Sequence, residues 1–300
     1  MNFPSAIENT PKIELRSLDE LWFQVSGTLC NLECTHCFIS CSPQNDSFGY
    51  LSLETVERML RDSQKWGVKE YYFTGGEPFL NREMVPILES TLKFGPATVL
   101  TNGTVLKPEW LERLQAAEKQ GVYSLEFRVS IDGPTSEMND PIRGERTFER
   151  AMQGVSLLCE FGFLPIITMT RTWDISDDAD ILGRFREVLR ERGCSRPRLK
   201  VLPRLQIGSE EKRTEGYTEH DRITQEMMEG YDADQLICSH SRIVTSKGVY
   251  VCPILIDSPA AKMGETLDEA AEPFPLSQGA CWTCYQYGAI CTNPSGQRME

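Results

Sequence analysis

The stretch Cys30-Asn-Leu-Glu-Cys34-Thr-His-Cys37 holds three cysteines in the spacing C-x3-C-x2-C. It follows residues 21–27, whose apolar and aromatic side chains predict a β-strand. Soft thiolate ligands bind iron, and a tight loop can wrap one iron–sulfur cube. A cube has four irons, so this loop leaves one of them to a fourth ligand. That ligand is either a further cysteine, for which Cys41 lies close by, or a bound substrate.

Strand and helix signals alternate after this loop. Ser52 is a good N-cap for an amphipathic segment that ends near Gly67, and Pro108 stands at a permitted position early in a helix. Each strand–helix unit has the length of a right-handed βαβ crossover, whereas residues 1–18 predict only an arm or an edge strand. The predicted strands are residues 21–27, 69–74, 97–101, 124–131, 164–170 and 198–202, and the later helices are residues 82–93, 108–119, 147–161 and 177–192.

Polar motifs follow the first four predicted strands directly. A doubly wound sheet and a parallel barrel both fit the alternation, but a barrel builds its site from polar residues at the C-terminal ends of its strands. We therefore predict an α/β fold, namely a partial (βα)6 parallel barrel that is open on one side. The motifs are the cysteine loop, Gly75-Gly-Glu-Pro78, Thr101-Asn-Gly103 and Ser130-Ile-Asp-Gly133.

A charged, glycine-containing stretch at residues 208–216 predicts a domain boundary. The core would then be residues 1–207, and residues 208–300 would form a small cysteine-rich C-terminal α+β extension. A β-hairpin is predicted at residues 242–245 and 249–251 because a Ser-Lys-Gly turn separates them. The cysteines of this part are Cys238, Cys252, Cys281, Cys284 and Cys291.

Composition restricts the function of the chain. A net charge of −13 and a pI near 4.9 disfavour binding to nucleic acid or to an anionic membrane. The sequence shows no secretory signal and no apolar run long enough to span a bilayer. Eleven cysteines without such a signal favour metal binding over disulfides and a reducing, cytoplasmic compartment.

The cysteine loop followed by Gly-Gly-Glu-Pro resembles the radical S-adenosylmethionine (SAM) superfamily over residues 18–207. The resemblance implies that Cys30, Cys34 and Cys37 hold a [4Fe-4S] cluster whose free iron binds SAM. His36 stands where the family usually has an aromatic residue. The competing interpretation is a structural zinc site completed by Cys41.

The resemblance also implies a set of residues that bind SAM. Two glycines let the backbone approach the ligand closely, and the turn would present carbonyls or a carboxylate to the ammonium group of SAM. Arg143 would pair with the carboxylate of SAM, because a guanidinium binds a carboxylate in bidentate geometry. An ordinary role in turns and at the surface remains open for several of these residues. The set is Gly75, Gly76, Glu77, Pro78, Asn102, Ser130, Asp132, Arg143 and His36.

The C-terminal cysteines resemble the twitch domain, the smaller relative of the SPASM domain. The resemblance implies one auxiliary [4Fe-4S] cluster bound by Cys238, Cys252, Cys281 and Cys284, and a zinc site from the same residues is the alternative. Cys41 and Cys291 are left over as inert thiols, hydrogen-atom donors or further ligands. Cys159 and Cys194 fall on or beside helical stretches and are expected to be core or surface thiols.

The implied chemistry is reductive cleavage of SAM to a 5′-deoxyadenosyl radical that abstracts a hydrogen atom from a substrate. An electron donor such as flavodoxin or ferredoxin would supply the first electron, and the auxiliary cluster would accept one from the substrate radical. An oxidoreductase acting on a small polar metabolite, by oxidation or epimerisation, is our first expectation, because the segment before the first strand leaves no room for a peptide-binding domain. The alternatives are maturation of a ribosomally made peptide and a non-catalytic iron–sulfur or zinc scaffold.

Overall fold

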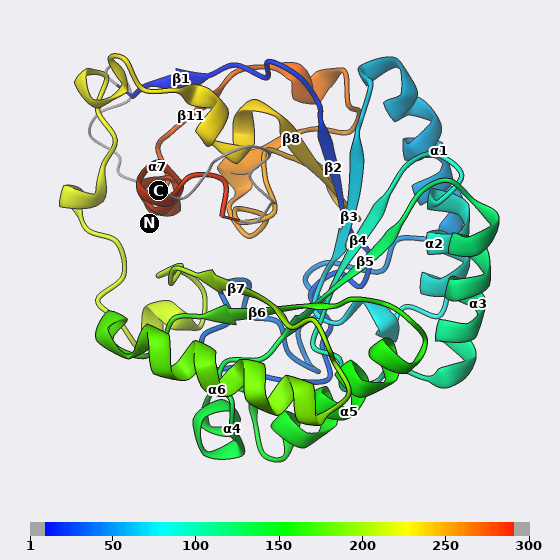
Figure 1. Ribbon diagram of the computed structural model, residues 1–300. Coiled ribbons are helices and arrows are strands. Elements are labelled where there is room, and N and C mark those ends of the chain that lie inside the picture. The colour runs from blue at the N-terminus through cyan, green and yellow to red at the C-terminus, as the bar shows by residue number, and fades with distance from the viewer. Residues whose placement is uncertain (1–9, 291–300) are drawn as a thin grey trace.

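The computed structural model describes residues 10–290, so Cys291 lies outside the described residues. Six parallel strands in sequence order make up most of one curved, nine-stranded sheet, and helices cover its convex side (Figure 1). The prediction of a partial six-stranded parallel barrel is confirmed. The strands are β2 (Glu20–Gln24), β3 (Glu70–Thr74), β4 (Ala97–Thr101), β5 (Leu125–Ser130), β6 (Ile166–Thr170) and β7 (Arg198–Leu202).

Amphipathic helices connect these strands. The Ser52 side chain accepts a hydrogen bond from the backbone N–H of Thr55, as its predicted N-cap role requires. A short helix, α4 (Ser136–Arg143), was not predicted, and it follows the Asp132-Gly-Pro turn at the end of β5. The longer helices are α1 (Leu53–Ser63), α2 (Met84–Thr91), α3 (Pro108–Gln120), α5 (Thr147–Glu160) and α6 (Asp178–Glu191).

Alternation along the strands separates two apolar cores. Phe23 and Phe73 stack at 5.3 Å between ring centroids and belong to the core under the helices. Their chain neighbours Trp22 and Tyr72 stack at 4.2 Å and belong to the second core, inside the barrel. Because side chains of a strand alternate between faces, a register slip by one residue would exchange the two sets. The pairing of Trp22 with Tyr72 and of Phe23 with Phe73 therefore positions the interior of the barrel.

The predicted C-terminal hairpin is present and continues the sheet of the barrel. β8 (Ser241–Thr245) pairs in parallel with β2, and β9 (Gly248–Tyr250) and β10 (Lys262–Gly264) follow it antiparallel. The sheet thus ends at β10 on one side and at β7 on the other. The main-chain hydrogen bonds between β8 and β2 join the two predicted parts into one sheet. The domain boundary at residue 208 therefore stays a prediction.

Short elements complete the C-terminal part. β1 (Lys12–Ile13) pairs with β11 (Phe274–Pro275), so the N-terminal arm packs as an edge strand on the C-terminal part. α7 (Gly279–Tyr287) carries two of the cysteines. Single 3-10 turns are frequent: Gln64–Trp66, Pro78–Leu80, Ile175–Asp177, Glu210–Lys212, Glu219–Asp221, Glu226–Met228, Ala233–Gln235, Ile237–Ser239, Pro259–Ala261 and Glu269–Ala271.

Cys159 and Cys194 form a disulfide. This corrects two expectations: that these two residues are separate thiols, and that the cysteines of the chain bind metal and form no disulfides. Cys159 lies in the last turn of α5, and Cys194 lies just beyond α6. The fold brings these ends of two neighbouring helices within 5.8 Å between Cα atoms, although 35 residues separate them in the sequence. Spacing alone could not pair them. Among the described residues, no helix is long and apolar enough to cross a membrane.

Candidate functional site

A cavity of about 210 Å³ occupies the barrel at the C-terminal ends of the strands. The three cysteines of the C-x3-C-x2-C loop line it together with one or more residues from each of the six parallel strands. Pro253, the neighbour of Cys252, also lines the cavity, which therefore extends to the C-terminal part. The predicted residues in its wall are Cys30, Cys34, His36, Cys37, Cys41, Gly75, Gly76, Asn102, Ser130 and Arg143.

Backbone hydrogen bonds hold the cysteine loop from several sides. The N–H of Cys30 donates to Ser42 at 3.1 Å, and the N–H of Thr35 donates to Ile142 in α4 at 2.8 Å. The carbonyl of Cys37 accepts from Ser209 at 2.9 Å. The loop is therefore shaped by segments far away in the sequence and not only by its own residues.

Gly208, the residue before Ser209, allows the backbone of this segment to approach Cys37 closely. Gly208 has φ of +64°, and a Cβ placed there would lie 2.7 Å from the carbonyl oxygen of Cys37. Glycine is therefore required for close approach to the cysteine loop. The stretch at 208–216, interpreted from sequence as a boundary, packs against the candidate site, and the charge pattern of the stretch gave no sign of this.

The Gly-Gly-Glu-Pro turn lies against the cysteine loop in the way predicted for a close backbone approach. A Cβ on Gly76 would lie 2.0 Å from the carbonyl oxygen of Leu29 and 2.8 Å from the Cβ of Cys30, so no side chain fits there. Gly75 has φ of +153° and would meet Ser26 Oγ at 2.1 Å. Both glycines line the cavity, which leaves main-chain atoms of the turn near any ligand. Pro78 opens a 3-10 turn and does not line the cavity.

The Glu77 carboxylate is fully buried and points into the protein. It accepts hydrogen bonds from Thr101 Oγ1 at 2.7 Å and from the N–H groups of Asn102 at 2.7 Å and Phe79 at 3.1 Å. Burial raises its pKa to about 7 in spite of these donors. The sequence predicted that either carbonyls or a carboxylate of this turn would face the ligand, and only the carbonyls can do so. The Glu77 carboxylate instead connects the end of β3 to the end of β4.

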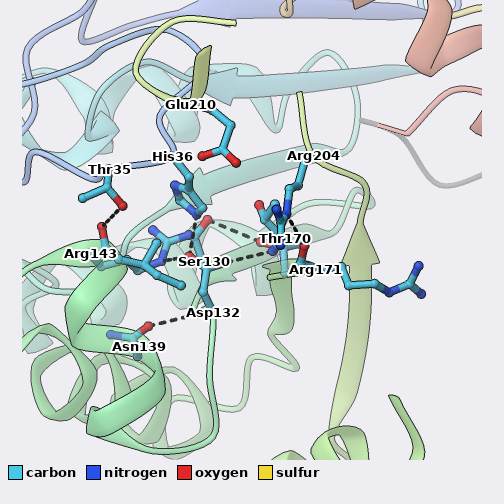
Figure 2. A network of polar contacts seen from close by, with 12 residues as sticks. Thr35, His36, Ser130, Asp132, Asn139, Arg143, Thr170, Arg171, Arg204 and Glu210 are labelled. Carbon is cyan, nitrogen blue, oxygen red and sulfur yellow. Dashed lines mark hydrogen bonds and ion pairs between the residues drawn. The ribbon is translucent and has the colours of Figure 1, made fainter. Parts of the chain in front are cut away.

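Asp132 is the centre of a polar network behind the cavity wall (Figure 2). Its carboxylate lies 2.6 Å from His36 Nε2 and 2.6 Å from Arg143 Nε, and it accepts from the N–H of Thr170 at 2.7 Å. The Asn139 side chain accepts from the N–H of Asp132 at 3.0 Å. Burial alone would raise the pKa of Asp132, but the charges of Arg143 and His36 hold that pKa well below its usual range.

This network divides the predicted SAM-binding residues into two groups. His36 and Arg143 line the cavity, whereas Asp132 is fully buried behind them and does not. Asp132 therefore positions an imidazole and a guanidinium, in place of the direct ligand contact that the sequence suggested. The His36 Nδ1 atom is buried and lacks a hydrogen-bond partner within residues 10–290. Such an atom is available to a polar ligand.

Three further predicted residues lie in the same wall. The Asn102 amide donates to Asn31 Oδ1 at 2.9 Å and lies 3.8 Å from Cys30 Sγ. Ser130 lies 3.3 Å from Thr168 through their hydroxyl oxygens. Cys41 is buried, its N–H donates to Cys37 Sγ at 3.3 Å, and its thiol lies 3.9 Å from the carbonyl oxygen of Gly75. Cys41 thus shares the cavity with the three loop cysteines, as a fourth ligand of the loop or a hydrogen-atom donor would require.

The other four predicted ligands form a second cysteine site. Cys238 lies in a 3-10 turn before β8, Cys252 follows β9, and Cys281 and Cys284 lie on α7. All four are buried and line one small cavity. The rest of its lining is apolar: Leu236, Ile237, Val251, Ile254, Leu255, Phe274, Leu276 and Ala280.

Arg242 brings a positive charge to this second site. It is fully buried on β8 and donates to the carbonyls of Cys238 and Ala270 at 2.7 Å and 2.6 Å. Its guanidinium interacts electrostatically with Cys238 and Cys252. A donor set of cysteines beside a cation is suited to an anionic iron–sulfur cluster. Within residues 10–290, no three His, Cys, Asp or Glu side chains are grouped closely enough to hold a single metal ion.

Sequence comparison places the chain in a family. The sequence model of the radical SAM superfamily matches residues 25–182, more than half of the chain and the segment that holds the cysteine loop and the Asp132 network. The chain belongs to the radical SAM superfamily. SAM and a [4Fe-4S] cluster are therefore the cofactors expected of its site, and the chemistry of the Cys30 loop fits them.

Three curated relatives are similar over the core. The antilisterial bacteriocin subtilosin biosynthesis protein AlbA of Bacillus subtilis is 32% identical over 159 residues, which are 50% of this chain and 34% of that protein. The mycofactocin maturase MftC of Mycobacterium ulcerans is 28% identical over 167 residues, or 54% and 43% of the two chains. An AdoMet-dependent heme synthase of Methanosarcina barkeri is 35% identical over 144 residues, or 47% and 39%. The match spans less than half of each relative.

Solved structures share the fold at low sequence identity. SuiB of Streptococcus suis bound to its precursor peptide SuiA has a TM-score of 0.63 at 17% identity, covering 86% of this chain and 66% of that one. Native anSMEcpe with bound AdoMet has a TM-score of 0.61 at 19% identity, covering 84% and 80%. Both likenesses extend beyond the segment that the family model matches.

Sequence reasoning missed part of the cavity wall. Trp22, Arg128 and Lys200 lie on the predicted strands, and their inward direction follows from strand alternation once the inner face is known. Arg204 comes from the segment after β7. Nothing in their sequence context indicated a site, because isolated cations in strands carry no motif.

Proposed function

We propose that this chain is a radical SAM enzyme that modifies a residue of a ribosomally made peptide, by oxidation or crosslinking. The observation that carries the proposal is the single cavity that reaches from the C-x3-C-x2-C loop across the barrel to Pro253, beside Cys252. A substrate bound there would lie between the two cysteine sites.

Named residues would hold the cofactors. Cys30, Cys34 and Cys37 would bind the cluster, and the backbone at Gly75 and Gly76 would face the SAM ammonium group. When bound, cluster and SAM supply a radical able to abstract a hydrogen atom from carbon. Arg143, held by Asp132, would orient the SAM carboxylate, and His36 would offer its unpaired Nδ1. The apolar wall at Trp22, Leu100 and Leu202 would exclude water from the reacting groups.

The second site would hold an auxiliary [4Fe-4S] cluster through Cys238, Cys252, Cys281 and Cys284. Four buried thiols within an apolar cavity leave that cluster no open position for a substrate, so its role would be electron transfer. An external donor such as flavodoxin or ferredoxin would supply reducing equivalents to the first site. The net reaction would then be an oxidation.

Relatives support a peptide substrate over the small metabolite that the sequence alone favoured. Two of them are named as a bacteriocin biosynthesis protein and a mycofactocin maturase, and a structural neighbour binds a precursor peptide. The heme synthase shows that a similar core also serves other chemistry. The proposal therefore concerns the peptide as substrate and not the particular residue modified.

Turnover tests the proposal in two arms. The reconstituted chain, with dithionite and SAM under anaerobic conditions, is incubated with the low-molecular-weight extract of its source organism, and 5′-deoxyadenosine is quantified by chromatography. One half of the extract is first digested with a protease that is then inactivated. We expect extract to stimulate 5′-deoxyadenosine formation and digestion to abolish the stimulation.

A stimulation that survives digestion would overturn the peptide substrate and return the small metabolite to first place. The matched control adds inactivated protease to undigested extract. Heavy water then separates the outcomes, because an epimerised product gains one deuterium while an oxidised product loses hydrogen.

A further inference from the structure

Glu210 is a buried carboxylate to which neither the sequence motifs nor the cofactor assignments above give a role. It lies in the 3-10 turn Glu210–Lys212, on the segment that follows β7, and it lines the main cavity. Only 3% of its side chain is exposed. Burying a carboxylate costs free energy unless hydrogen bonds replace its hydration, so the partners of Glu210 indicate what the residue does.

Glu210 has fewer partners than the other two buried carboxylates of the site. Glu77 accepts three hydrogen bonds, and Asp132 is held by an imidazole, a guanidinium and a backbone N–H. Within residues 10–290, the side chain of Glu210 has one partner, Arg213, whose Nη1 donates to Oε2 at 3.2 Å. The other carboxylate oxygen, Oε1, accepts no hydrogen bond from that part of the chain. A buried acceptor of this kind is available to a ligand.

The segment that carries this carboxylate contacts the residues on both sides of His36. The N–H of Ser209 donates to the carbonyl of Cys37 at 2.9 Å, and Arg213 Nη1 donates to Thr35 Oγ1 at 3.2 Å. Figure 2 shows the carboxylate beside the imidazole ring. The carboxylate is therefore positioned at the cysteine loop itself, next to the residue before the third cysteine.

His36 offers a second acceptor in the same cavity. Its Nε2 lies 2.6 Å from the ionised Asp132, and an imidazole that donates through Nε2 leaves Nδ1 as an acceptor. Nδ1 is buried and has no hydrogen-bond partner within the described residues. Each of the two side chains is thus held through one atom, by Asp132 or by Arg213, and leaves another atom for a ligand. Two neighbouring acceptors match a group that carries two hydrogen-bond donors.

We propose that Glu210 and His36 form an acceptor pair for the adenosine part of SAM, in which Glu210 selects the donor group. The inference rests on the proposed function, since it requires SAM to bind at the cysteine loop. Adenosine carries two groups with paired donors, the exocyclic amine of adenine and the diol of ribose. A peptide also carries N–H donors, but the contacts of residues 209 and 213 join Glu210 to the loop where SAM is expected.

Two SAM analogues separate the amine from the diol. One carries two methyl groups on the exocyclic amine, and the other lacks both ribose hydroxyls. Anaerobic calorimetry measures the affinity of the reconstituted chain for SAM and for each analogue. We expect at least one analogue to bind about tenfold more weakly than SAM, because a hydrogen bond to a charged acceptor is stronger than one between neutral groups.

Variants assign this preference to Glu210. Glu210→Met keeps the approximate size of the side chain and removes the acceptor, so the affinity for SAM should fall about tenfold while the affinity for the weaker analogue stays within about twofold. Glu210→Gln restores one acceptor oxygen and should recover part of the preference. Arg213→Met is the matched control, because it breaks the same ion pair and leaves the carboxylate in place. Iron analysis verifies that each variant holds its clusters.

Equal affinity of the wild type for SAM and both analogues would overturn the acceptor pair, and so would a preference that survives in Glu210→Met. A preference lost to the same extent in Arg213→Met would show that Glu210 only holds the segment in place, which would also overturn a contact with the ligand. A wild type that binds neither SAM nor the analogues would contradict the proposed function as well. The peptide substrate is tested separately by the digested extract, whose result does not alter these affinities.

Discussion

The two cysteine sites of this chain differ in what surrounds them. Cys30, Cys34 and Cys37 line a cavity that also contains a histidine, several hydroxyls and four cationic side chains, and two of these cysteines are only half-buried. Cys238, Cys252, Cys281 and Cys284 are all buried among apolar side chains, beside one buried arginine. The first arrangement would admit a polar ligand to a metal bound by its cysteines, and the second would exclude one.

That difference indicates a division of labour. A site with three ligands and a polar approach can bind substrate on the metal, whereas a site with four ligands and an apolar enclosure can only exchange electrons. The loop cysteines line the main cavity, and Pro253, the neighbour of Cys252, lines it as well, whereas the four C-terminal cysteines line a separate small cavity.

The largest effect should come from the triple variant Cys30→Ala/Cys34→Ala/Cys37→Ala. It should lose SAM cleavage completely and retain about four of about eight iron atoms, because the second site keeps its ligands. Chromatography of 5′-deoxyadenosine and iron analysis measure the two quantities. Residual cleavage above the background without enzyme would show that the loop does not hold the reactive cluster.

The reverse variant replaces Cys238, Cys252, Cys281 and Cys284 by Ala. It should keep SAM cleavage within about threefold of wild type while losing about four iron atoms and the conversion of substrate. Stability should fall as well, since metal binding contributes to folding where ligands come from separate segments. If metal analysis of the wild-type protein found zinc at this site and not iron, an electron-transfer role for the site would be contradicted.

Sequence alone predicted strands β2–β7, the longer helices between them and the members of both cysteine sets, because each rests on a local pattern: apolar alternation in β2–β7, cap residues such as Ser52, and cysteine spacing. It could not predict contacts that join distant segments. Asn139 and Thr170 meet Asp132 only after β5, α4 and β6 have packed, and Gly208 reaches the cysteine loop across most of the chain. The side-by-side pairing of β8 with β2 has the same origin.

Asp132→Asn should loosen the first site without touching its cysteines. The change leaves Arg143 and His36 without their buried carboxylate, and breaking a buried pair costs about 3–5 kcal/mol of unfolding free energy. Affinity for SAM should fall about tenfold or more, because Arg143 is no longer oriented. Denaturant unfolding and SAM calorimetry measure these effects. Asp178→Asn is the control. It removes the carboxylate that pairs with Arg171, and because this carboxylate is more exposed than that of Asp132, the free energy of unfolding should fall by only about 1 kcal/mol.

The pKa of Asp132 fixes the sign of the pH dependence. Because that pKa lies well below its usual range in the folded protein, the ion pairs stabilise the fold above the ordinary Asp pKa of about 3.9 and lose their effect on further acidification. The stability difference between wild type and Asp132→Asn should therefore be the same at pH 7 and pH 5. A difference that vanishes by pH 5 would show that Asp132 is not held ionised.

A smaller effect is expected at the second site from Tyr217→Phe. The Tyr217 hydroxyl lies 2.6 Å from Thr283 Oγ1 on α7 and accepts from the N–H of Gln206 at 3.3 Å. Losing these bonds should cost about 1 kcal/mol of stability and leave SAM cleavage unchanged. Tyr50→Phe, at a ring that is 46% exposed, is the neutral control. Impaired SAM cleavage in Tyr217→Phe alone would show that the two sites are not separable.

Electron paramagnetic resonance of the two cysteine variants tests the division of labour most directly. Each variant, reconstituted and reduced with dithionite, should hold one cluster, and its spectrum is recorded with and without SAM. The account predicts that SAM changes the spectrum of the cluster on Cys30, Cys34 and Cys37 and leaves the spectrum of the cluster on Cys238, Cys252, Cys281 and Cys284 unaltered. A response of the second cluster to SAM, or none from the first, would contradict it.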